Sequence, residues 1–596
     1  MVQSATVEVG TVVHVAAPGD ICGELEVTLP DTAPAEDVYT LVTIEGEGTF
    51  AADLLSKVVA PENAILRLSA DEKSVLCVYG NPVNTWVGGS SGSLSEASNW
   101  SLRYVPQSGD SCVIGSQTAA TLTVGGTFAP SSITFPADTA LITINAEGEE
   151  AISGLATVVN NSSQHHVIAC PVDASAKTPA LPLAESSYLV FSGGISLTAM
   201  PSVQEGMRLA GTWNLDGDWK APPSGTQIVP HSEVNVFGSL VSGYNIAVSE
   251  GATLKAGTVR VELGADGKNR ALYENKGNFV VSGVIENTIL SSSGQYDVSG
   301  FFAKGGEDAV TQVNGLVHAA STYNNHRFRL NNKDDSSINK IVLGSGGLSF
   351  RNNLDTHKQC YPYFQIDKDK SVELASSDDW SFGANPVPGR DLCLELEGQL
   401  YIDTSDYDVR NVPHTVRVKG GIGNGTGKVT VNGCGKLLFE YGSWFGGGLY
   451  VKDNATVSCN AGCGPTNCTI NVGTSAVFEV AESGVVKIGK GMALANGATL
   501  KFNFTERNKP PVIDFANNSV SVAEDGQVKI DISAQGFTRP AVGVYKLTEG
   551  LTHERGFVAG SVVLAENAPH WVKSLAVDDT GNILLDVSVG TKIIVR

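Results

Sequence analysis

Apolar and polar residues alternate in short runs along most of the chain, and each run ends at Gly, Asn, Asp or Ser. Clear examples are KVTVNG (428–433), GLYVKDNATVS (448–458) and NILLDVSVG (582–590). A period of two puts successive side chains on opposite faces of a β-strand. The best helical candidate, AADLLSKVVA (51–60), is too short to show three turns of helical periodicity. The pattern therefore predicts an all-β protein of many short strands.

A turn of small polar residues, then an alanine, then an alternating strand recurs at a nearly fixed distance. The clearest copies are KDNATVSC (452–459), VGTSAVFEV (472–480) and LANGATLKF (494–502), whose alanines are 21 and 22 positions apart, and SEGATLKA (249–256) has the same form. A repeat of about 20–25 residues is typical of one coil of a parallel β-helix, or β-solenoid, whose inward side chains form apolar columns. An array of β-sandwiches is the alternative, but its strands need no fixed coil length.

The two ends of the chain also resemble each other. DVYTLVTIEGEGTF (37–50) is similar to GVYKLTEGLTHERGF (543–557), and residues 58–78 are similar to residues 562–587. The comparison pairs three positions: Tyr39 with Tyr545, Asp71 with Asp578, and Cys77 roughly with Leu584. An exchange of cysteine for leucine indicates a buried apolar position rather than a reactive thiol.

Trp86 and Trp100 flank a stretch of Gly, Ser and small polar residues that precedes the repeats. The open end of a β-helix exposes an apolar core and unpaired strand edges, so we expect the two rings to plug that end. Pro106 and the pair Gly109–Asp110 set a turn after them. The chain is thus expected to comprise four segments: an N-terminal β module (1–82), a Trp-bearing cap (83–113), a β-solenoid (114–505) and a C-terminal β module (506–596).

The cap carries the pattern W-x-G-G, N-W, P-x-x-G-D, formed here by Trp86, Gly88, Gly89, Asn99, Trp100, Pro106, Gly109 and Asp110. This pattern resembles the opening motif of bacterial autotransporter-associated β-strand-repeat surface proteins, and residues 495–515 and 581–596 resemble their closing part. The resemblance covers residues 85–113 and 420–596. The resemblance implies a right-handed parallel β-helix that is secreted or surface-exposed, structural or adhesive, and without catalytic residues.

Charge restricts the partners. The 596 residues include 40 Lys and Arg against 62 Asp and Glu, a net charge of −22 that disfavours nucleic acid and anionic membranes. No apolar run approaches the roughly 20 residues of a membrane span. The first residues alternate like a strand and unlike a signal peptide. The protein is therefore either intracellular or has lost a leader, and we favour the second, with an extracellular or cell-surface location.

Four cysteines, Cys434, Cys459, Cys463 and Cys468, gather in the clearest repeats. Their spacing is not a standard zinc pattern, although four thiolates would suit zinc. Disulfides and a buried column of thiols are the other readings, and the 25 positions between Cys434 and Cys459 are close to one coil and favour stacking.

Oxygen ligands for calcium are offered by Asp403, Asp406 and Asp408, with Asp406 and Asp408 expected on one strand face. A solvated turn is the alternative reading. A polysaccharide lyase or glycosidase would need convergent charged groups, and Asp378, Asp379, Arg390 and Asp391 could supply them, although they form no recognisable motif. We find no nucleotide-binding or hydrolase motif and expect no cofactor, calcium apart.

The sequence therefore predicts a non-enzymatic extracellular or cell-surface structural protein. A glycan-binding adhesin is the binding alternative, because rings group near glycines in CYPYF (360–364) and YGSWFGGGLY (441–450). A β-helix lyase or glycosidase is the enzyme alternative. Because the N-terminal module resembles the C-terminal one, the ends could either cap the solenoid or join copies head to tail.

Overall fold

The structure is a computed structural model of the chain. It describes residues 5–8, 11–17, 25–28, 38–50, 54–55, 58–60, 64–69, 71–79, 83–174, 189–197, 207–220, 226–242, 246–261, 273–275, 277–283, 285–287, 297–298, 310–313, 317–321, 327–329, 338–345, 347–352, 363–366, 368–382, 392–423, 425–452 and 454–589. The chain forms two compact units, residues 1–222 with 231–237, and residues 223–230 with 238–596. The prediction of an all-β fold is confirmed: no described residue is α-helical.

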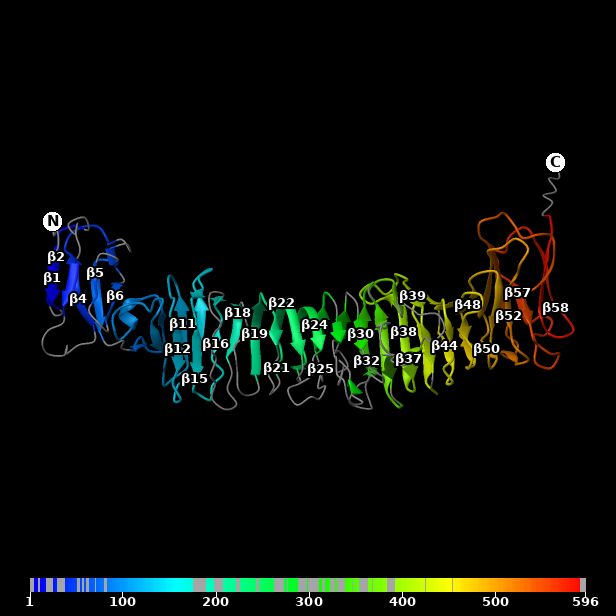
Figure 1. The fold of residues 1–596 in the computed structure, drawn as a ribbon, viewed down its shortest axis with the longest axis horizontal. Helices are drawn as coiled ribbons and strands as arrows, with labels where there is room; N and C mark the ends of the chain where they lie inside the picture. Colours follow the sequence, from blue (N-terminus) through cyan, green and yellow to red (C-terminus); the bar gives the residue numbers. More distant parts are fainter. Residues whose placement is uncertain are drawn as a thin grey trace. The chain divides into compact units, whose positions relative to one another are not determined.

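The clearest coils of the second unit have three strands each, and strands at the same place in successive coils pair in parallel (Figure 1). The first strands are β44 (Leu449–Val451), β47 (Ile470–Val472) and β50 (Met492–Leu494). The second strands are β45 (Thr456–Cys459), β48 (Val477–Val480) and β51 (Thr499–Phe504). The third strands are β46 (Gly464–Pro465), β49 (Gly484–Lys487) and β52 (Pro511–Asp514). This is the stacking of a parallel β-helix, as the repeat predicts.

Further strands extend the rows of first and second strands in both directions. Earlier in the chain these are β35 (Ser371–Ser376), β36 (Trp380–Phe382), β38 (Gln399–Asp406), β39 (Thr415–Val418), β41 (Lys428–Asn432) and β42 (Lys436–Phe439). Later in the chain they are β53 (Val520–Val522), β54 (Val528–Ala534) and β57 (Val562–Leu564). The third row also includes β40 (Gly421–Gly423), β43 (Gly442–Ser443) and β56 (Thr548–Glu549).

The repeated alanines mark the corner between first and second strands. Ala455, Ala476 and Ala498 are fully buried, and the N–H of each donates to the carbonyl three residues earlier. The carbonyls of Ala455 and Ala476 accept bonds from the next coil, from the N–H groups of Val477 and Thr499. In these three coils a small side chain fits the corner, which points into the core.

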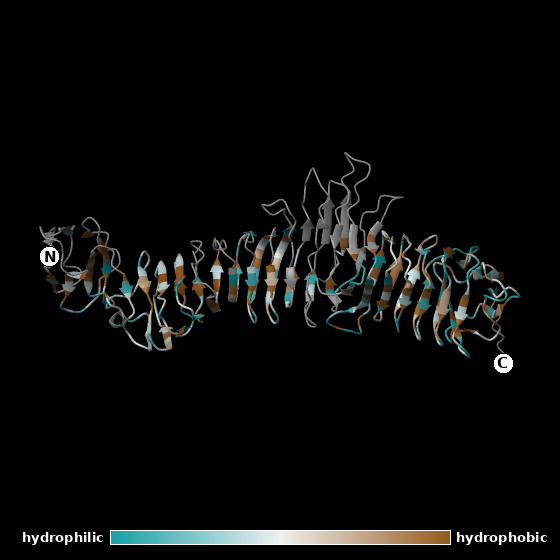
Figure 2. Cartoon of the chain, turned by 90° about the horizontal axis from the view of Figure 1, so that it is seen from below, coloured by the Kyte–Doolittle hydropathy of each residue, from teal (hydrophilic) through white to brown (hydrophobic). Residues whose placement is uncertain are grey.

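Inward side chains stack into columns, while polar residues alternate with them along the strands (Figure 2). One column runs through Val457, Phe478, Leu500 and Ile530, and a second through Cys459, Val480, Phe502 and Ile532. All eight side chains are buried. The alternation read from the sequence is therefore the division between core and solvent.

The first unit contains the start of the repeats. One parallel sheet is formed by β8 (Asn84–Thr85), β10 (Ser111–Val113), β12 (Ser132–Phe135) and β15 (Thr157–Asn160). A second row follows β9 (Ser91–Ser93), β11 (Ala120–Val124), β13 (Ile142–Ala146) and β16 (Val167–Ile168). The cap also includes a 3-10 turn, η3 (Ala97–Asn99).

The repeats include further strands. Up to residue 261 they are β14 (Ile152–Ser153), β17 (Val172–Asp173), β18 (Val190–Leu197), β19 (Met207–Leu215), β20 (Trp219–Lys220), β21 (Thr226–Ile228), β22 (Glu233–Ser242), β23 (Ile246–Val248) and β24 (Thr253–Val261). Beyond it they are β25 (Tyr273–Asn275), β26 (Asn278–Val281), β27 (Ile285–Asn287), β28 (Asp297–Val298), β29 (Val310–Val313), β30 (Val317–Ser321), β31 (Arg327–Arg329), β32 (Ile338–Leu343), β33 (Leu348–Asn352), β34 (Tyr363–Ile366) and β37 (Leu392–Leu396).

The terminal modules have the same order of antiparallel strands. In the N-terminal module β4 (Val38–Ile44), β7 (Ser74–Tyr79) and β6 (Ala64–Leu68) are neighbours in that order, and β2 (Val13–Val15) lies beyond β4. In the C-terminal module β55 (Gly543–Lys546), β59 (Ile583–Val587) and β58 (Val572–Val577) are neighbours in that order. Three further strands, β1 (Ala5–Glu8), β3 (Leu25–Thr28) and β5 (Val58–Val59), form a parallel sheet.

The strand register refines the correspondence between the modules. Tyr39 lies opposite Cys77, and Tyr545 lies opposite Leu585. Cys77 therefore matches Leu585, one position beyond the Leu584 suggested by the sequence. Both side chains are fully buried, and burial raises the pKa of the Cys77 thiol to about 11. A thiol in this state is an apolar core group and a poor nucleophile.

Candidate functional site

The two tryptophans of the cap pack against each other. Their backbones form an antiparallel bridge, and their rings meet edge to face with centroids 5.7 Å apart. Trp100 also stacks on Phe128 at 5.7 Å. Both indoles are buried, and their N–H groups donate to the carbonyls of Gly89 at 2.9 Å and Leu94 at 2.8 Å. These hydrogen bonds offset the cost of burying the polar N–H of each indole.

Gly88 and Asn99 of the motif make room for these rings. A Cβ on Gly88 would lie 2.6 Å from the Trp86 ring and 2.8 Å from the Asn99 side-chain oxygen. Asn99 donates through Nδ2 to the carbonyl of Ser93 at 2.9 Å, which holds the Gly/Ser stretch across the rings. The spacing of the motif thus follows from contacts inside the cap.

The second half of the motif joins three parts of the chain. The side chain of Asp110 is 2% exposed and accepts hydrogen bonds from the Gln107 N–H at 2.8 Å and from Arg67 Nη2 at 2.5 Å. The Gly109 N–H donates to the Ser131 hydroxyl at 2.7 Å. Arg67 belongs to the N-terminal module and Ser131 to the next coil, so this turn connects both to the cap. Pro106 is buried beside it, and its carbonyl accepts from the Ala129 N–H.

An apolar contact accompanies this ion pair. Leu76 and Val78, on the outer face of the N-terminal sheet, pack against the buried Tyr104 of the cap. The sequence does not point to Tyr104. Nor does it point to Arg67: the strand register of the structure matches Arg67 to Ala576 in the C-terminal module, so the charge is present in one copy only.

Substitution Arg67→Ala is expected to destabilise the N-terminal module by about 1.5–3 kcal/mol, because hydrogen bonds to a charged group contribute on that order and Asp110 would stay buried. Thermal unfolding with limited proteolysis of the module would measure the loss. Arg103→Ala, at an exposed arginine of the cap, is the control and is expected to change little. Equal effects of the two substitutions would show that the ion pair does not hold the module.

Two of the three aspartates proposed as calcium ligands form ion pairs with nearby side chains. Asp403 pairs with Arg410, with Oδ2 2.9 Å from Nη1, and Asp406 pairs with His414, with Oδ2 3.0 Å from Nε2. The hydrogen bond from His414, followed by those from backbone N–H groups, holds the pKa of Asp406 below its usual value. Strand β38 ends at Asp406, and Asp408 lies in the turn that follows. The expectation that Asp406 and Asp408 share a strand face is therefore wrong.

His414 also approaches Asp379, with its Nδ1 3.5 Å from Oδ1. The same carboxylate oxygen accepts the Thr415 N–H at 2.6 Å. Both ring nitrogens of His414 thus face carboxylates, which suits a side chain that fixes a turn. Of the other proposed catalytic residues, Asp378 accepts the Asp379 N–H, and Arg390 and Asp391 lie outside the described residues. Nothing in the sequence singles out His414, because its partners come from other turns.

The four cysteines separate into two environments. Cys434 is exposed in the turn after β41, with its sulfur 3.3 Å from the Ser405 hydroxyl. Cys459 is buried in the core between Phe439 and Val480 of adjacent coils. The prediction that Cys434 stacks on Cys459 is therefore wrong. The spacing of the two cysteines suggests a place for Cys434 in the core column, but the residue lies in a turn.

The other two thiols lie within the same coil as Cys459. Cys468 is buried, and burial raises its pKa to about 12, whereas Cys463 is half-buried and donates to the Glu440 carbonyl at 3.2 Å. All four thiols are free. Within the described part of the chain, no three His, Cys, Asp or Glu side chains are arranged to hold a metal ion.

A buried carboxylate lies on the outward face of the second row of strands. Glu479 is 2% exposed, and its oxygens contact Lys436 Nζ at 2.6 Å, Lys501 Nζ at 3.1 Å and Asn503 Nδ2 at 2.8 Å. Burial alone would raise the pKa of Glu479, but hydrogen bonds from Lys436 and Asn503 and the Lys436 charge lower it to about 2. The cluster links three coils, since Lys436, Glu479 and Lys501 belong to β42, β48 and β51.

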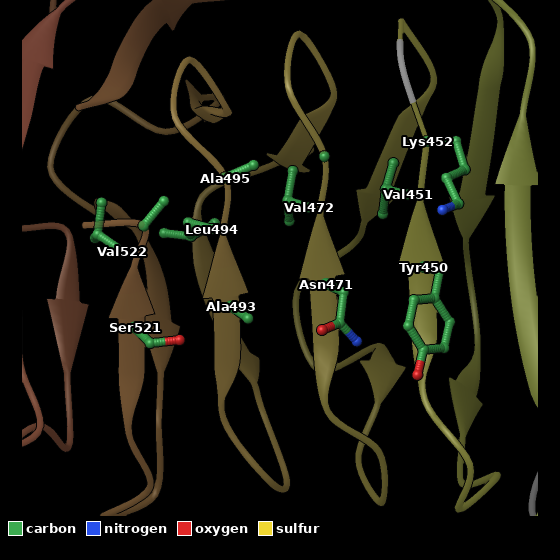
Figure 3. A pocket seen from close by; sticks show the side chains of 12 residues that line it. Tyr450, Val451, Lys452, Asn471, Val472, Ala493, Leu494, Ala495, Ser521 and Val522 are labelled. Atoms are coloured by element: carbon green, nitrogen blue, oxygen red, sulfur yellow. The ribbon is translucent and has the colours of Figure 1, made fainter. Parts of the chain in front are cut away.

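An open groove of about 390 Å³ crosses the first row of strands in the second unit. Its outward column runs through Tyr450, Asn471, Ala493 and Ser521 (Figure 3). The groove is hollow where the column has its smallest side chain, with the phenol of Tyr450 at one end. Tyr450 closes the aromatic segment 441–450 noted in the sequence, whereas residues 360–362 of the other segment lie outside the described residues.

Comparison of the chain with protein-family models, curated proteins and solved structures gives no match. No helix among the described residues has the length and apolar character needed to cross a membrane.

Proposed function

We propose that this protein is a non-enzymatic, extracellular or cell-surface structural protein built on a capped parallel β-helix. The cap carries the proposal. Trp86, Trp100 and Asp110, which give the motif its resemblance to surface β-helix proteins, are all buried and bonded inside the cap. The polar groups considered for catalysis support the same reading, because Asp379 and Asp406 are used to bind backbone N–H groups and His414.

The test is a pair of assays on the purified chain. Incubation with a panel of neutral and acidic polysaccharides, followed by reducing-end and unsaturated-product detection, is expected to give no turnover. Product formation on any polysaccharide that disappears in a His414→Ala variant would replace the structural proposal with an enzymatic one.

Glycan binding is a second candidate, and the groove beside Tyr450 favours it. The half-buried ring of Tyr450, at the end of a trough of small residues, can stack on a sugar face, while Asn471, Ser521 and Lys452 offer hydrogen bonds. A glycan array with the whole chain would identify a ligand.

Tyr450→Ala is then expected to weaken binding by up to about tenfold, because one lost stacking contact contributes at most about 1.5 kcal/mol. Tyr401→Ala is the matched control, since Tyr401 belongs to the same outward column, separated from Tyr450 by Thr430 alone, and lies outside the groove. Equal losses in both variants, or none in Tyr450→Ala, would exclude the groove as the binding site. Isothermal titration calorimetry measures both affinities.

The outer face of the C-terminal sheet bears on whether copies of the chain assemble head to tail. Positions matching the apolar Ile65 and Val78 of the N-terminal sheet hold Ser574 and Asp586. Val544 on that face is 66% exposed. A face that has Ser574 and Asp586 in place of two apolar residues and leaves Val544 in solvent suits a solvated end better than a docking contact with the cap of another copy. An assembly contact is therefore better sought elsewhere.

A further inference from the structure

The N-terminal module resembles the C-terminal part of the chain in more than its antiparallel sheet. Its parallel strands β1, β3 and β5 match β51, β54 and β57: Thr6 lies opposite Glu26, and Thr499 opposite Lys529. The sequences agree at this point, with SATVEV (4–9) beside GATLKF (497–502). The module therefore begins with a coil of a β-helix and not only with a cap.

The second strand of that coil is preserved as well. Val13 of β2 lies opposite Val42 of β4, and Ile513 of β52 lies opposite Thr548 of β56. When Tyr39 is aligned with Tyr545, Val42 aligns with Thr548. The strands that pair with these two residues, β2 and β52, therefore correspond to each other. Strands β1 and β2 thus both have counterparts in residues 499–514.

The two copies differ on the side of this coil where a preceding coil would pair. In the C-terminal copy, β48 pairs with β51 from Val477 onward, and β49 pairs with β52 from Gly484 onward. In the N-terminal copy, β1 and β2 are edge strands of their sheets among the described residues. Within the described part of the chain these two strands, which have the register of a β-helix coil, therefore pair on one side only, and an unpaired strand side is a template for pairing with another strand.

We propose that the β1–β2 edge binds the final coil of another parallel β-helix, in the register that β48 and β49 have on β51 and β52. The partner is a different β-helix and not a second copy of this chain, because in this chain the matching edges of β48 and β49 are already covered by β51 and β52. Residues 1–113 then form a joint: the closing coil of one β-helix followed directly by the cap of the next. This inference rests on the fold and is independent of the proposed function.

The test adds the missing coil to the whole chain. Residues 470–495, which contain β47 to β50, are placed directly before Gln3, the position that matches Asn496. Hydrogen exchange is read at the amides of β1 and β2 that do not bond to β3 or β4. The added coil is expected to slow their exchange at least tenfold. The control carries the same segment with prolines in place of Phe478 and Val485 of the added copy, which removes N–H donors and breaks strand pairing.

Two outcomes would overturn the proposal. Equal exchange in the added-coil chain and its proline control would show that the edge does not accept a coil. The unmodified chain is expected to sediment as a monomer at all concentrations. Concentration-dependent oligomers that disappear when the coil is added would show that the occupant is a second copy and not another β-helix. Neither result depends on polysaccharide turnover or binding.

Discussion

Trp100→Ala is expected to lower the free energy of unfolding by about 3–5 kcal/mol, the range for truncating a buried tryptophan. The ring is fully buried between Trp86 and Phe128, so its removal leaves a cavity bounded by two other rings. The Leu94 carbonyl also loses its only side-chain donor among the described contacts. The measurement is thermal unfolding followed by circular dichroism, with hydrogen exchange of the strands next to the cap as a local readout.

The matched control for this prediction is Val87→Ala in the same segment. Val87 is 59% exposed, and truncation there is expected to stay within about 0.5 kcal/mol of the original chain. A melting temperature of Trp100→Ala equal to that of the control would mean that the ring does not close the β-helix, and the cap interpretation would have to be abandoned.

The fold could be predicted because a β-helix repeats its local chemistry. The clearest coils have a small residue at the corner, and Ala455, Ala476 and Ala498 show it directly in the sequence. The alternation around them separates core from solvent, since the strand period is two. The cap could be recognised for a similar reason, because the residues of its motif lie within about 25 positions of each other along the chain, from Trp86 to Asp110.

Contacts between coils could not be predicted in the same way. His414 meets Asp379 across 35 positions, and Glu479 meets Lys436 across 43. Such pairs depend on the exact length of every intervening turn, which a single sequence does not reveal. The same uncertainty caused the error for Cys434: a spacing of 25 is close to one coil, but the residue falls in a turn.

The buried Glu479 cluster gives the second large effect. Glu479→Ala removes the carboxylate and leaves the ammonium groups of Lys436 and Lys501 close together without a counter-charge. We expect a loss of about 3 kcal/mol, the lower end for breaking a buried ion pair, because both lysines are partly exposed and can turn toward water. Glu506→Ala is the control: Glu506 pairs with Lys509 at the surface, where such a pair contributes about 0.5 kcal/mol or less.

The cluster also predicts a pH dependence with a definite sign. The folded pKa of Glu479, about 2, is below the ordinary value of 4.5 that applies to the unfolded chain. A lowered folded pKa means that the stabilisation is fully present above pH 4.5 and is lost as the pH falls from there toward 2. Urea unfolding between pH 6 and 3 should therefore show a steeper loss for the original chain than for Glu479→Gln, which keeps the shape but cannot titrate. Parallel curves for the two proteins would show that Glu479 is not held as a carboxylate by its lysines, and that the three coils are joined by backbone pairing and apolar columns alone.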